Sequence, residues 1–384
     1  MRRAVPLSLL SLLSALLASP AAAQAPLTHF HEALGEGRAR VFVYGASHTA
    51  AGTYVEVLRA GLQARFGDGG PGWIVPSSPF PFYAPQRVTI GGGGWRGLAR
   101  RFGRRVPGPL GLAGIALDAT GYAHATVVAE RSFDEVSIHF HRRDGAAPLQ
   151  VRVGDETWTV ETARRPGQPS AGVFRFTLPA PAHRVALITD GPARVFGLAL
   201  DRQAGGITVD NFGVPGARFS DQARWDESAL SGALVMRPPD LVVFAYGTNE
   251  SSNHRVTLEA YRARLRAGLR AWRRRAPDAS CLLMGPADWP REDRHGGLGP
   301  RPRLTSIVAI QAEEARRARC AFLDTFARMG GEGSMARWVA RGWGSLDHVH
   351  FTDEGYRRIG AWLLEAVLPP EPDSVPEAVS VPQE

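Results

Sequence analysis

From about residue 207 to about residue 368, short apolar runs alternate with segments that have helical periodicity. The apolar runs begin at Ile207, Leu241, Cys281 and Cys320. The helical patterns cover residues 258–274, 305–317 and 354–366. A run that is apolar throughout is typical of a strand buried on both faces, and its alternation with helices predicts a doubly wound parallel sheet. The apolar run Arg40–Tyr44, followed by a helical pattern over Tyr54–Phe66, predicts a further strand and helix of the same sheet.

A different pattern separates these two parts. Residues 84–206 contain runs in which apolar and polar residues alternate, and turn-forming pairs such as Asp144-Gly145 stand between them. The runs include Val136–His141, Leu149–Val153, Val173–Leu178 and Arg184–Thr189. Short runs with a period of two at this spacing favour a β-sandwich. We therefore predict an α/β fold with a doubly wound parallel sheet that is interrupted by a β-sandwich insertion.

The two ends of the chain have compositions of their own. Arg2 and Arg3 precede an apolar run over Leu7–Leu17, and Ala23-Gln24-Ala25 fits the pattern that signal peptidase cuts. The run is too short to cross a bilayer, so it favours a secretory signal peptide over a buried core helix or a membrane anchor. We predict a signal peptide over 1–25, the two parts of the α/β domain over 26–83 and 207–370, the insertion over 84–206, and a disordered tail over 371–384 rich in Pro, Glu and Ser.

Charge and cysteines limit the kinds of partner. The net charge is +8, and arginine supplies all 45 basic residues, which we interpret as the codon bias of a GC-rich genome. The chain lacks the basic clusters interleaved with aromatic residues that are typical of nucleic-acid binding, although a basic surface suits an anionic cell-wall polymer. Cys281 and Cys320 each open an apolar run, so they form either a disulfide between neighbouring strands or two buried thiols.

Four short segments at or beyond the ends of predicted strands carry candidate site residues. Ser47 follows the first strand, Gly216 follows the second, and Asn249 follows the third. Asp347 and His350 lie just before the last helical pattern. Because ligands bind at the carboxyl ends of the strands in open α/β sheets, these residues are candidates for one site. Each segment alone is a weak signal, since a serine or asparagine after a strand is more often a helix cap.

Together, these segments resemble the four blocks of the SGNH (GDSL) hydrolase superfamily, which supply Ser, Gly, Asn and His in this order. More narrowly, the chain is similar to the bacterial peptidoglycan O-acetylesterases of this superfamily, which also carry a β-rich insertion between the first two blocks. The closer resemblance rests on Gly45-Ala-Ser-His-Thr-Ala50, Leu62-Gln-Ala-Arg-Phe-Gly-Asp-Gly-Gly70, Pro239-Asp-Leu-Val-Val243, Tyr246-Gly-Thr-Asn-Glu250, Met329-Gly-Gly-Glu-Gly-Ser-Met335 and Asp347-His-Val-His-Phe-Thr352. The resemblance implies a flavodoxin-like sheet.

The resemblance also implies roles that the chemistry of these residues allows. Ser47 would be the nucleophile, His350 the base that takes its proton, and Asp347 the acid that orients the imidazole. The backbone N–H groups of Ser47 and Gly216 and the side-chain amide of Asn249 would form the oxyanion hole. One position departs from the family pattern, because Ala46 stands where the first block usually has an aspartate.

Histidines near these blocks have alternative interpretations. His48 fits the family pattern, but a supporting role in the loop is equally compatible with its position. The family spacing favours His350 over His348 as the base. For His139 and His141, which alternate on one predicted strand, we favour a solvated sheet face over a metal site.

We therefore predict an exported serine esterase, periplasmic or secreted, that removes O-acetyl groups from a cell-wall glycan. The resemblance favours the C6 O-acetyl group of N-acetylmuramic acid in peptidoglycan. An O-acetyltransferase, an esterase for another acetylated polysaccharide, and a catalytically weak glycan-binding protein are the alternatives. The predicted partner is an O-acetylated polysaccharide, with no nucleic acid, no metal, no cofactor and no membrane insertion after removal of the signal. The substrate-binding residues and the oligomeric state are not predicted.

Overall fold

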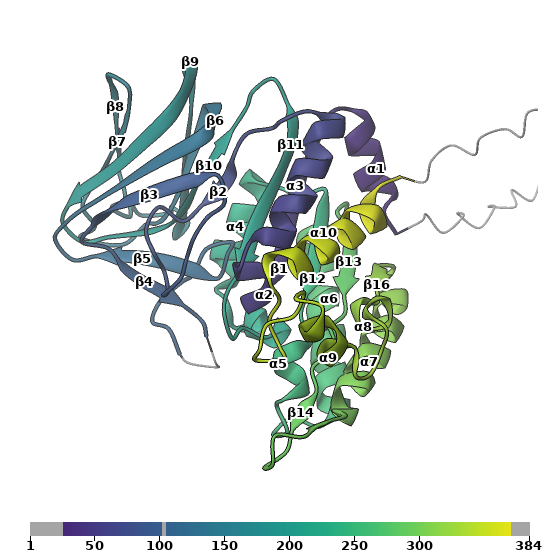
Figure 1. The fold of residues 1–384 in the computed structure, drawn as a ribbon. Coiled ribbons are helices and arrows are strands. Elements are labelled where there is room, and N and C mark those ends of the chain that lie inside the picture. The colour runs from purple at the N-terminus through teal and green to yellow at the C-terminus, as the bar shows by residue number, and fades with distance from the viewer. Residues whose placement is uncertain (1–25, 102–104, 370–384) are drawn as a thin grey trace, which may run out of the picture.

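The computed structural model describes residues 26–101 and 105–369. The predicted signal peptide and the predicted C-terminal tail lie outside the described residues. Figure 1 shows two sheets side by side, a parallel sheet wrapped by helices and an antiparallel sheet that carries no helices on its outer face.

The parallel sheet has five strands in the order β11-β1-β12-β13-β16. Their bounds are β1 (Arg38–Gly45), β11 (Gly206–Gly213), β12 (Leu241–Ala245), β13 (Ser280–Met284) and β16 (Ala321–Leu323). Numbered along the chain within this sheet, the order is 2-1-3-4-5, which is that of flavodoxin-like folds. The predicted α/β class with a doubly wound parallel sheet is therefore confirmed.

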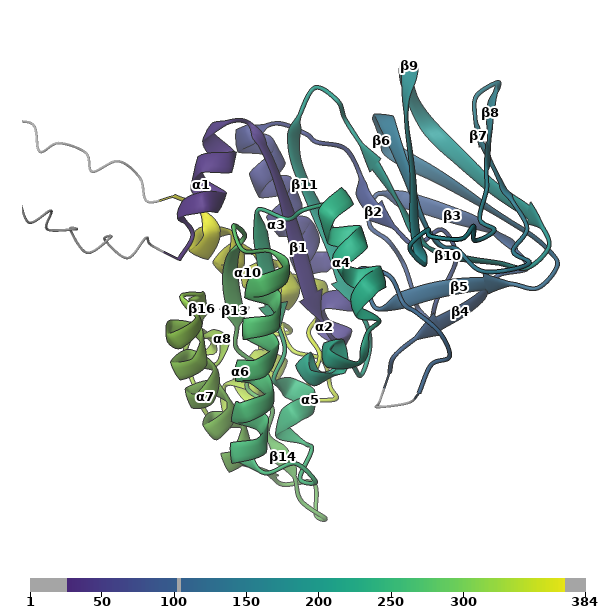
Figure 2. The same cartoon turned by 180° about the vertical axis from the view of Figure 1, so that it is seen from behind.

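Helices cover both faces of this sheet, because its strands are apolar on both sides (Figures 1 and 2). One face packs against α1 (Thr28–Gly35), α3 (Thr53–Phe66) and α10 (Asp353–Val367). The other packs against α4 (Glu227–Met236), α6 (Leu258–Arg275) and α7 (Pro302–Ala318). Shorter helical turns are α2 (Ser47–Ala50), η1 (Phe219–Arg224), α5 (Thr248–Ser251), α8 (Thr325–Met329) and α9 (Ser334–Ala340). In α6 the apolar positions are buried, whereas most of its arginines face outward.

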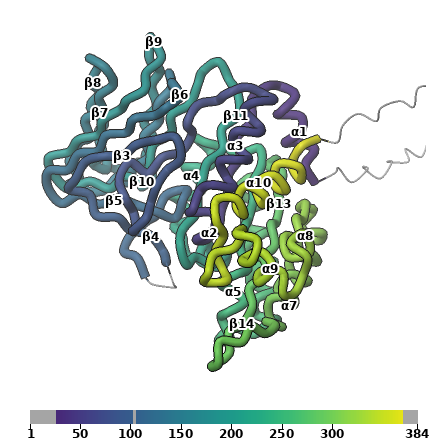
Figure 3. The backbone as a smooth tube through the Cα atoms, viewed as in Figure 1, coloured from purple at the N-terminus to yellow at the C-terminus, as the bar shows by residue number. Residues whose placement is uncertain are grey.

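The chain leaves α3, runs through the antiparallel sheet and returns to β11 (Figure 3). This sheet has nine strands, joined mainly in the order β4-β5-β10-β6-β9-β7-β8. Their bounds are β2 (Gly72–Ile74), β3 (Val88–Gly93), β4 (Arg96–Ala99), β5 (Ile115–Ala119), β6 (Tyr122–His141), β7 (Leu149–Val153), β8 (Glu156–Val160), β9 (Ala171–Asp190) and β10 (Ala193–Asp201). A small hairpin, β14 (Arg291–Glu292) and β15 (Leu298–Gly299), stands apart from both sheets.

Strand lengths in the insertion differ from the sequence prediction. The runs Val173–Leu178 and Arg184–Thr189, predicted as separate short strands, belong to the single strand β9. Its register with β6 shifts between Val128 and Glu135, opposite the segment of β9 that contains Pro179 and Pro181. Proline cannot donate to a ladder and is tolerated at such irregularities, so prolines that indicate a turn in the sequence lie within a bent strand here.

The two sheets are also joined by a strand pairing, a hydrogen bond and a shared apolar core. β2 pairs with β10, although it precedes residue 84, at which we place the start of the insertion. Tyr44 of β1 donates a hydrogen bond from its hydroxyl to the carbonyl of Leu112, at 2.9 Å. Apolar residues from both sheets form one core, which includes Phe42 of β1 and Trp73 and Phe196 of the antiparallel sheet. The domain boundaries stay a prediction, because the insertion is not an independent body.

A buried arginine joins the two sheets. Arg237, which follows α4 and is 1% exposed, binds Asp210 of β11 through Nε at 2.7 Å and Nη2 at 3.0 Å. It also pairs with Asp201 at the end of β10. Burial raises the pKa of the Asp201 carboxyl, but the charge and hydrogen bonds of Arg237 outweigh this, so the net shift is downward. One cation thus neutralises a carboxylate from each sheet.

We predict that Arg237→Ala destabilises the protein by about 3–5 kcal/mol, because it removes the cation that Asp210 and Asp201 share and leaves Asp201 with only the 3.8 Å pair to Arg40. Urea unfolding at pH 7 measures the change, with Arg274→Ala on the exposed face of α6 as control. Since the pKa of Asp201 is lowered in the folded state, its contribution is present above the unfolded pKa of about 4 and is lost as the pH falls below it. A loss below about 1 kcal/mol for Arg237→Ala would contradict this account.

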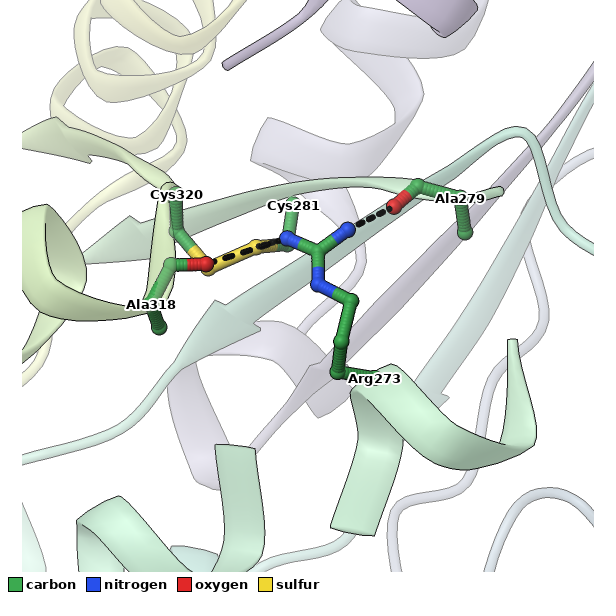
Figure 4. The surroundings of a disulfide bond; sticks show 5 residues. All are labelled: Arg273, Ala279, Cys281, Ala318 and Cys320. Carbon is green, nitrogen blue, oxygen red and sulfur yellow. Dashed lines mark hydrogen bonds between the residues drawn. A yellow bond between two sulfur atoms is a disulfide. The ribbon is translucent and has the colours of Figure 1, made fainter. Parts of the chain in front are cut away.

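A disulfide joins Cys281 of β13 to Cys320, which precedes β16. Of the two alternatives left open by the sequence, the structure therefore has the bridge. Figure 4 shows Arg273 beside it, donating to the carbonyl of Ala279 at 3.1 Å and to that of Ala318 at 3.0 Å. The bridge and the arginine link neighbouring strands at the amino end of the sheet, opposite the edge that carries the candidate site.

Candidate active site

The strand register brings the predicted site residues to one edge of the sheet. Gly45, at the end of β1, lies opposite Gly213 of β11 and opposite Ala245 of β12. Ser47, Gly216 and Asn249 follow these three strand ends within a few residues. Between β1 and β12 the chain order of the strands changes direction, which is where doubly wound sheets bind ligands.

Ser47, His350 and Asp347 form a continuous hydrogen-bonded chain. The Ser47 hydroxyl lies 2.9 Å from His350 Nε2. His350 Nδ1 lies 2.6 Å from Asp347 Oδ2, so a proton on Nδ1 leaves Nε2 free to accept from the serine. The other oxygen of Asp347 accepts from the backbone N–H groups of Val349 at 3.0 Å and His350 at 2.9 Å. This arrangement can take a proton from a serine hydroxyl that attacks a carbonyl carbon.

The loop that carries the histidine is held in place by Asp347. Burial raises the pKa of this carboxyl, but the hydrogen bonds from the His350 ring and from the two backbone N–H groups outweigh it, so the pKa is lowered. The carboxylate is therefore ionised near neutral pH, as a group that stabilises an imidazolium must be. His348 between them has a φ of +55°, an unusual conformation for a residue other than glycine, and it is His350 that contacts Ser47.

The triad is open to solvent. The side chains of His350 and Asp347 are 40% and 49% exposed. A site this open can admit an ester group carried on a large molecule, because the reacting atoms do not lie at the bottom of an enclosed pocket.

His48, directly after the serine, packs against the ring of His350. Its ring centroid lies 5.2 Å from that of His350, and its Nδ1 forms a 3.1 Å hydrogen bond with the hydroxyl of Tyr356. Burial, followed by the neighbouring His350, lowers the pKa of His48 to about 3, although Asp347 acts in the opposite direction. His48 therefore stays neutral and adds no charge that would repel a positive charge on His350 during reaction.

Gly216 lies in a tight turn after β11. In the segment Val214-Pro-Gly-Ala217, the Ala217 N–H donates to the Val214 carbonyl at 3.0 Å, and Gly216 has a φ of +75°. Proline at the second position and glycine with positive φ at the third are typical of a type II turn, in which the N–H of the glycine takes no part in the turn's own hydrogen bond. That N–H is available to a ligand at the sheet edge.

Asn249 is fixed beside this turn. Its Nδ2 donates to the Ala217 carbonyl at 2.9 Å, which leaves the second hydrogen of the amide for another acceptor. Ser47 begins α2, and the first N–H groups of a helix have no partner within it. The structure thus places the three predicted oxyanion donors on adjacent loops.

Two polar residues that the sequence analysis did not select hold these loops together. The buried carboxyl of Glu250 accepts from the N–H groups of Gly247 at 3.0 Å and Phe219 at 2.8 Å, and burial raises its pKa despite these bonds. Asn211 of β11 donates to the Thr49 carbonyl at 2.9 Å. The contacts of Glu250 with Phe219 and of Asn211 with Thr49 join loops that are distant in sequence, so the sequence of one loop alone does not indicate them.

Among the residues that the structure describes, no group of three or more His, Cys, Asp or Glu side chains is placed so that it could hold a metal ion. His139 is 1% exposed and packs edge-on against Trp73 at 4.7 Å between ring centroids, so the preferred interpretation of a solvated face was wrong for this residue.

Within residues 26–101 and 105–369, no helix is long and apolar enough to span a membrane.

Part of the chain matches a protein-family model, and a solved structure shares its fold. Residues 187–358 match the model of the GDSL-like Lipase/Acylhydrolase family. A solved structure titled "Peptidoglycan O-acetylesterase in action, 5 min" is similar with a TM-score of 0.76 and 26% identity, over 89% of this chain and 95% of the other. A lipase/acylhydrolase from Enterococcus faecalis is 21% identical, with a TM-score of 0.33, over 42% of this chain and 75% of the other. No curated protein matches the sequence.

The fold and these matches define a carboxylic ester hydrolase of the SGNH type. The predictions of an SGNH-type fold and of an esterase are therefore confirmed. The similarity to the first structure also extends through the inserted antiparallel sheet, because the parallel sheet and its helices alone do not make up 89% of the chain.

We predict that Gly45→Ala lowers kcat by about 100-fold or more, because a shift of about 1 Å at the serine has that effect. A Cβ atom at position 45 would lie 1.7 Å from Thr49 Oγ1 and 2.9 Å from the Ala245 carbonyl oxygen. Relief of this overlap must move α2, and with it Ser47. Hydrolysis of p-nitrophenyl acetate provides the measurement.

Gly35→Ala is the matched control for this substitution, because a Cβ atom at position 35 meets nothing within 4 Å. We expect the Gly35 variant to keep the activity of the wild type. Equal activities for the Gly45 and Gly35 variants would show that the position of the serine does not depend on the end of β1.

Proposed function

We propose that Ser47, His350 and Asp347 are the catalytic triad of this esterase, and that Ser47, Gly216 and Asn249 form its oxyanion hole. The 2.9 Å contact between Ser47 Oγ and His350 Nε2 carries the proposal. His350 takes the serine proton as the hydroxyl attacks the ester carbonyl, and then gives it to the leaving alcohol. Water attacks the acyl-Ser47 intermediate with His350 again as base, which releases the acid and restores the serine.

The oxyanion donors would act on the charge that develops during each attack. A backbone N–H at the start of α2, the N–H of Gly216 and the amide of Asn249 each contribute roughly 3 kcal/mol in comparable sites. Ala46, in place of the aspartate usual in the family, is buried and makes no side-chain hydrogen bond to any of these donors. The triad geometry is complete without that aspartate.

We further propose that the substrate is an O-acetylated glycan of the bacterial cell wall, and specifically the C6 O-acetyl group of N-acetylmuramic acid in peptidoglycan. Support comes from the similarity over 89% of the chain to a structure titled as a peptidoglycan O-acetylesterase. The open triad suits an acetyl group on a polymer. The basic composition suits a negatively charged wall, and the Cys281–Cys320 disulfide is typical of an oxidising compartment outside the cytosol.

We predict that Ser47→Ala lowers kcat on p-nitrophenyl acetate by about 10³-fold or more, because it removes the nucleophile. Asp347→Asn should lower kcat by about 10²–10⁴-fold with little change in KM, because the amide cannot stabilise the imidazolium. Steady-state kinetics on both variants, with circular dichroism to verify folding, make the measurement. A Ser47→Ala variant that retains wild-type activity would remove Ser47 from the mechanism.

For the substrate, we predict that the protein releases acetate from O-acetylated peptidoglycan faster than from acetylated xylan at equal ester concentration. Mass spectrometry of the digested wall should show the loss of 6-O-acetylated muramic acid, and Ser47→Ala should prevent it. Hydrolysis of p-nitrophenyl acetate without release from peptidoglycan would contradict the proposed substrate but not the esterase. Addition of chito-oligosaccharides tests for transfer, since acetylated oligosaccharide products would instead identify an O-acetyltransferase.

A further inference from the structure

Phe82 is a large apolar side chain with no contact that explains its position. It is 99% exposed, more than any other large apolar side chain in residues 26–101 and 105–369. Its φ is +66°, a backbone conformation that residues other than glycine rarely adopt. Both the exposed ring and the backbone conformation are unfavourable for folding, and their coincidence at one residue indicates a functional role.

The backbone around Phe82 forms a turn like that of Gly216. The Tyr83 N–H donates to the Phe80 carbonyl at 3.3 Å, with Pro81 at the second position and Phe82 at the third. Glycine is favoured at that third position. Phe80 is 5% exposed, and the Tyr83 hydroxyl accepts from the Val75 N–H at 3.1 Å. The residues on each side of Phe82 are therefore anchored, and the turn holds the ring out into solvent.

The turn belongs to a loop that packs beside the nucleophile. The side chain of Gln86 fills the space next to Gly52, since a Cβ atom there would lie 2.8 Å from Gln86 Nε2. Arg87 forms an ion pair with Glu56 at the start of α3. Gly52 follows α2, the helical turn that begins with Ser47. The loop containing Phe82 is thus attached to the chain segment directly after the catalytic serine.

A second exposed apolar side chain lies next to the triad. Leu346 is 86% exposed and directly precedes Asp347. By contrast, Val235 is 79% exposed near the end of α4, which leads into the amino end of β12 and so lies at the opposite edge of the sheet. Leu346 thus lies on the loop that carries Asp347 and His350, and Phe82 lies on the loop that contacts the segment after Ser47.

We propose that Phe82 forms a subsite that binds a sugar ring of the glycan substrate. One face of a pyranose ring presents C–H groups, and an exposed aromatic ring offers it a flat apolar surface. Leu346 adds apolar contact at the rim of the triad. This inference rests on the proposed action on an acetylated glycan, and it assigns to that reaction a binding site outside the triad and the oxyanion hole.

Kinetics on a polymeric and a small substrate test the subsite. For soluble O-acetylated peptidoglycan fragments, we expect Phe82→Ala to raise KM about two- to tenfold with kcat unchanged, which corresponds to the loss of one aromatic contact. Phe82→Tyr should keep the wild-type KM, and Leu346→Ala should raise it less than Phe82→Ala. The kcat/KM for p-nitrophenyl acetate should be unchanged in each variant, because that ester has no sugar ring. Val235→Ala is the matched control and should leave kcat and KM unchanged on both substrates.

Stability separates binding from a structural role. We expect Phe82→Gly to raise Tm, because glycine relieves the backbone strain, and to raise the glycan KM as Phe82→Ala does. A lower Tm together with equal losses on both substrates would overturn the subsite, since it would show that the ring supports the fold. An unchanged glycan KM in Phe82→Ala, with an active wild type, would also overturn it. A wild type inactive on every acetylated glycan would overturn the proposed function and the subsite together.

Discussion

The site depends on the parallel pairing of β1 with its two neighbours. Because Gly45 is in register with Gly213 and with Ala245, the loops after three strands begin at the same level of the sheet. A serine, a glycine and an asparagine from distant parts of the sequence are thereby brought to one edge of the sheet. The loop before α10 adds the histidine and the aspartate. A shift of this register by one residue would turn the side chains of a strand to the opposite face and separate these groups.

The sequence predicted the features that are repeated or local. Apolar strands alternating with helical patterns indicated the parallel sheet, and the short spacing from Asp347 to His350 allowed their contact to be expected. The continuous strand β9 was not predicted, because Pro179 and Pro181 are typical of turns and only the register of β6 shows that they occupy an irregularity. The cluster around Arg237 was also missed, because its two aspartates come from different sheets. Such contacts depend on the packing of the sheets, which local patterns do not determine.

The titratable groups near Ser47 and His350 differ in their charge and in their surroundings. Asp347 is an anion beside His350, whereas His48, in ring contact with His350, is neutral because it is buried. Glu250 lies deeper, where its carboxyl accepts backbone N–H groups and orders the loop that carries Asn249. The His350 imidazole is thus paired with a single nearby carboxylate, whereas His48 and Glu250 make contacts that order the loops around it.

The place of the insertion has a consequence for how the chain reaches this structure. The pairing of β1 with β11 closes a loop that contains the whole antiparallel sheet, and the entropy cost of closing a loop grows with its effective length. In the folded insertion, β2 at its start pairs with β10 near its end, so the two connections to the parallel sheet leave from adjacent strands. Once the antiparallel sheet has formed, the loop between β1 and β11 is effectively short, and the pairing of these two strands is no longer the kind of distant contact that makes folding slow.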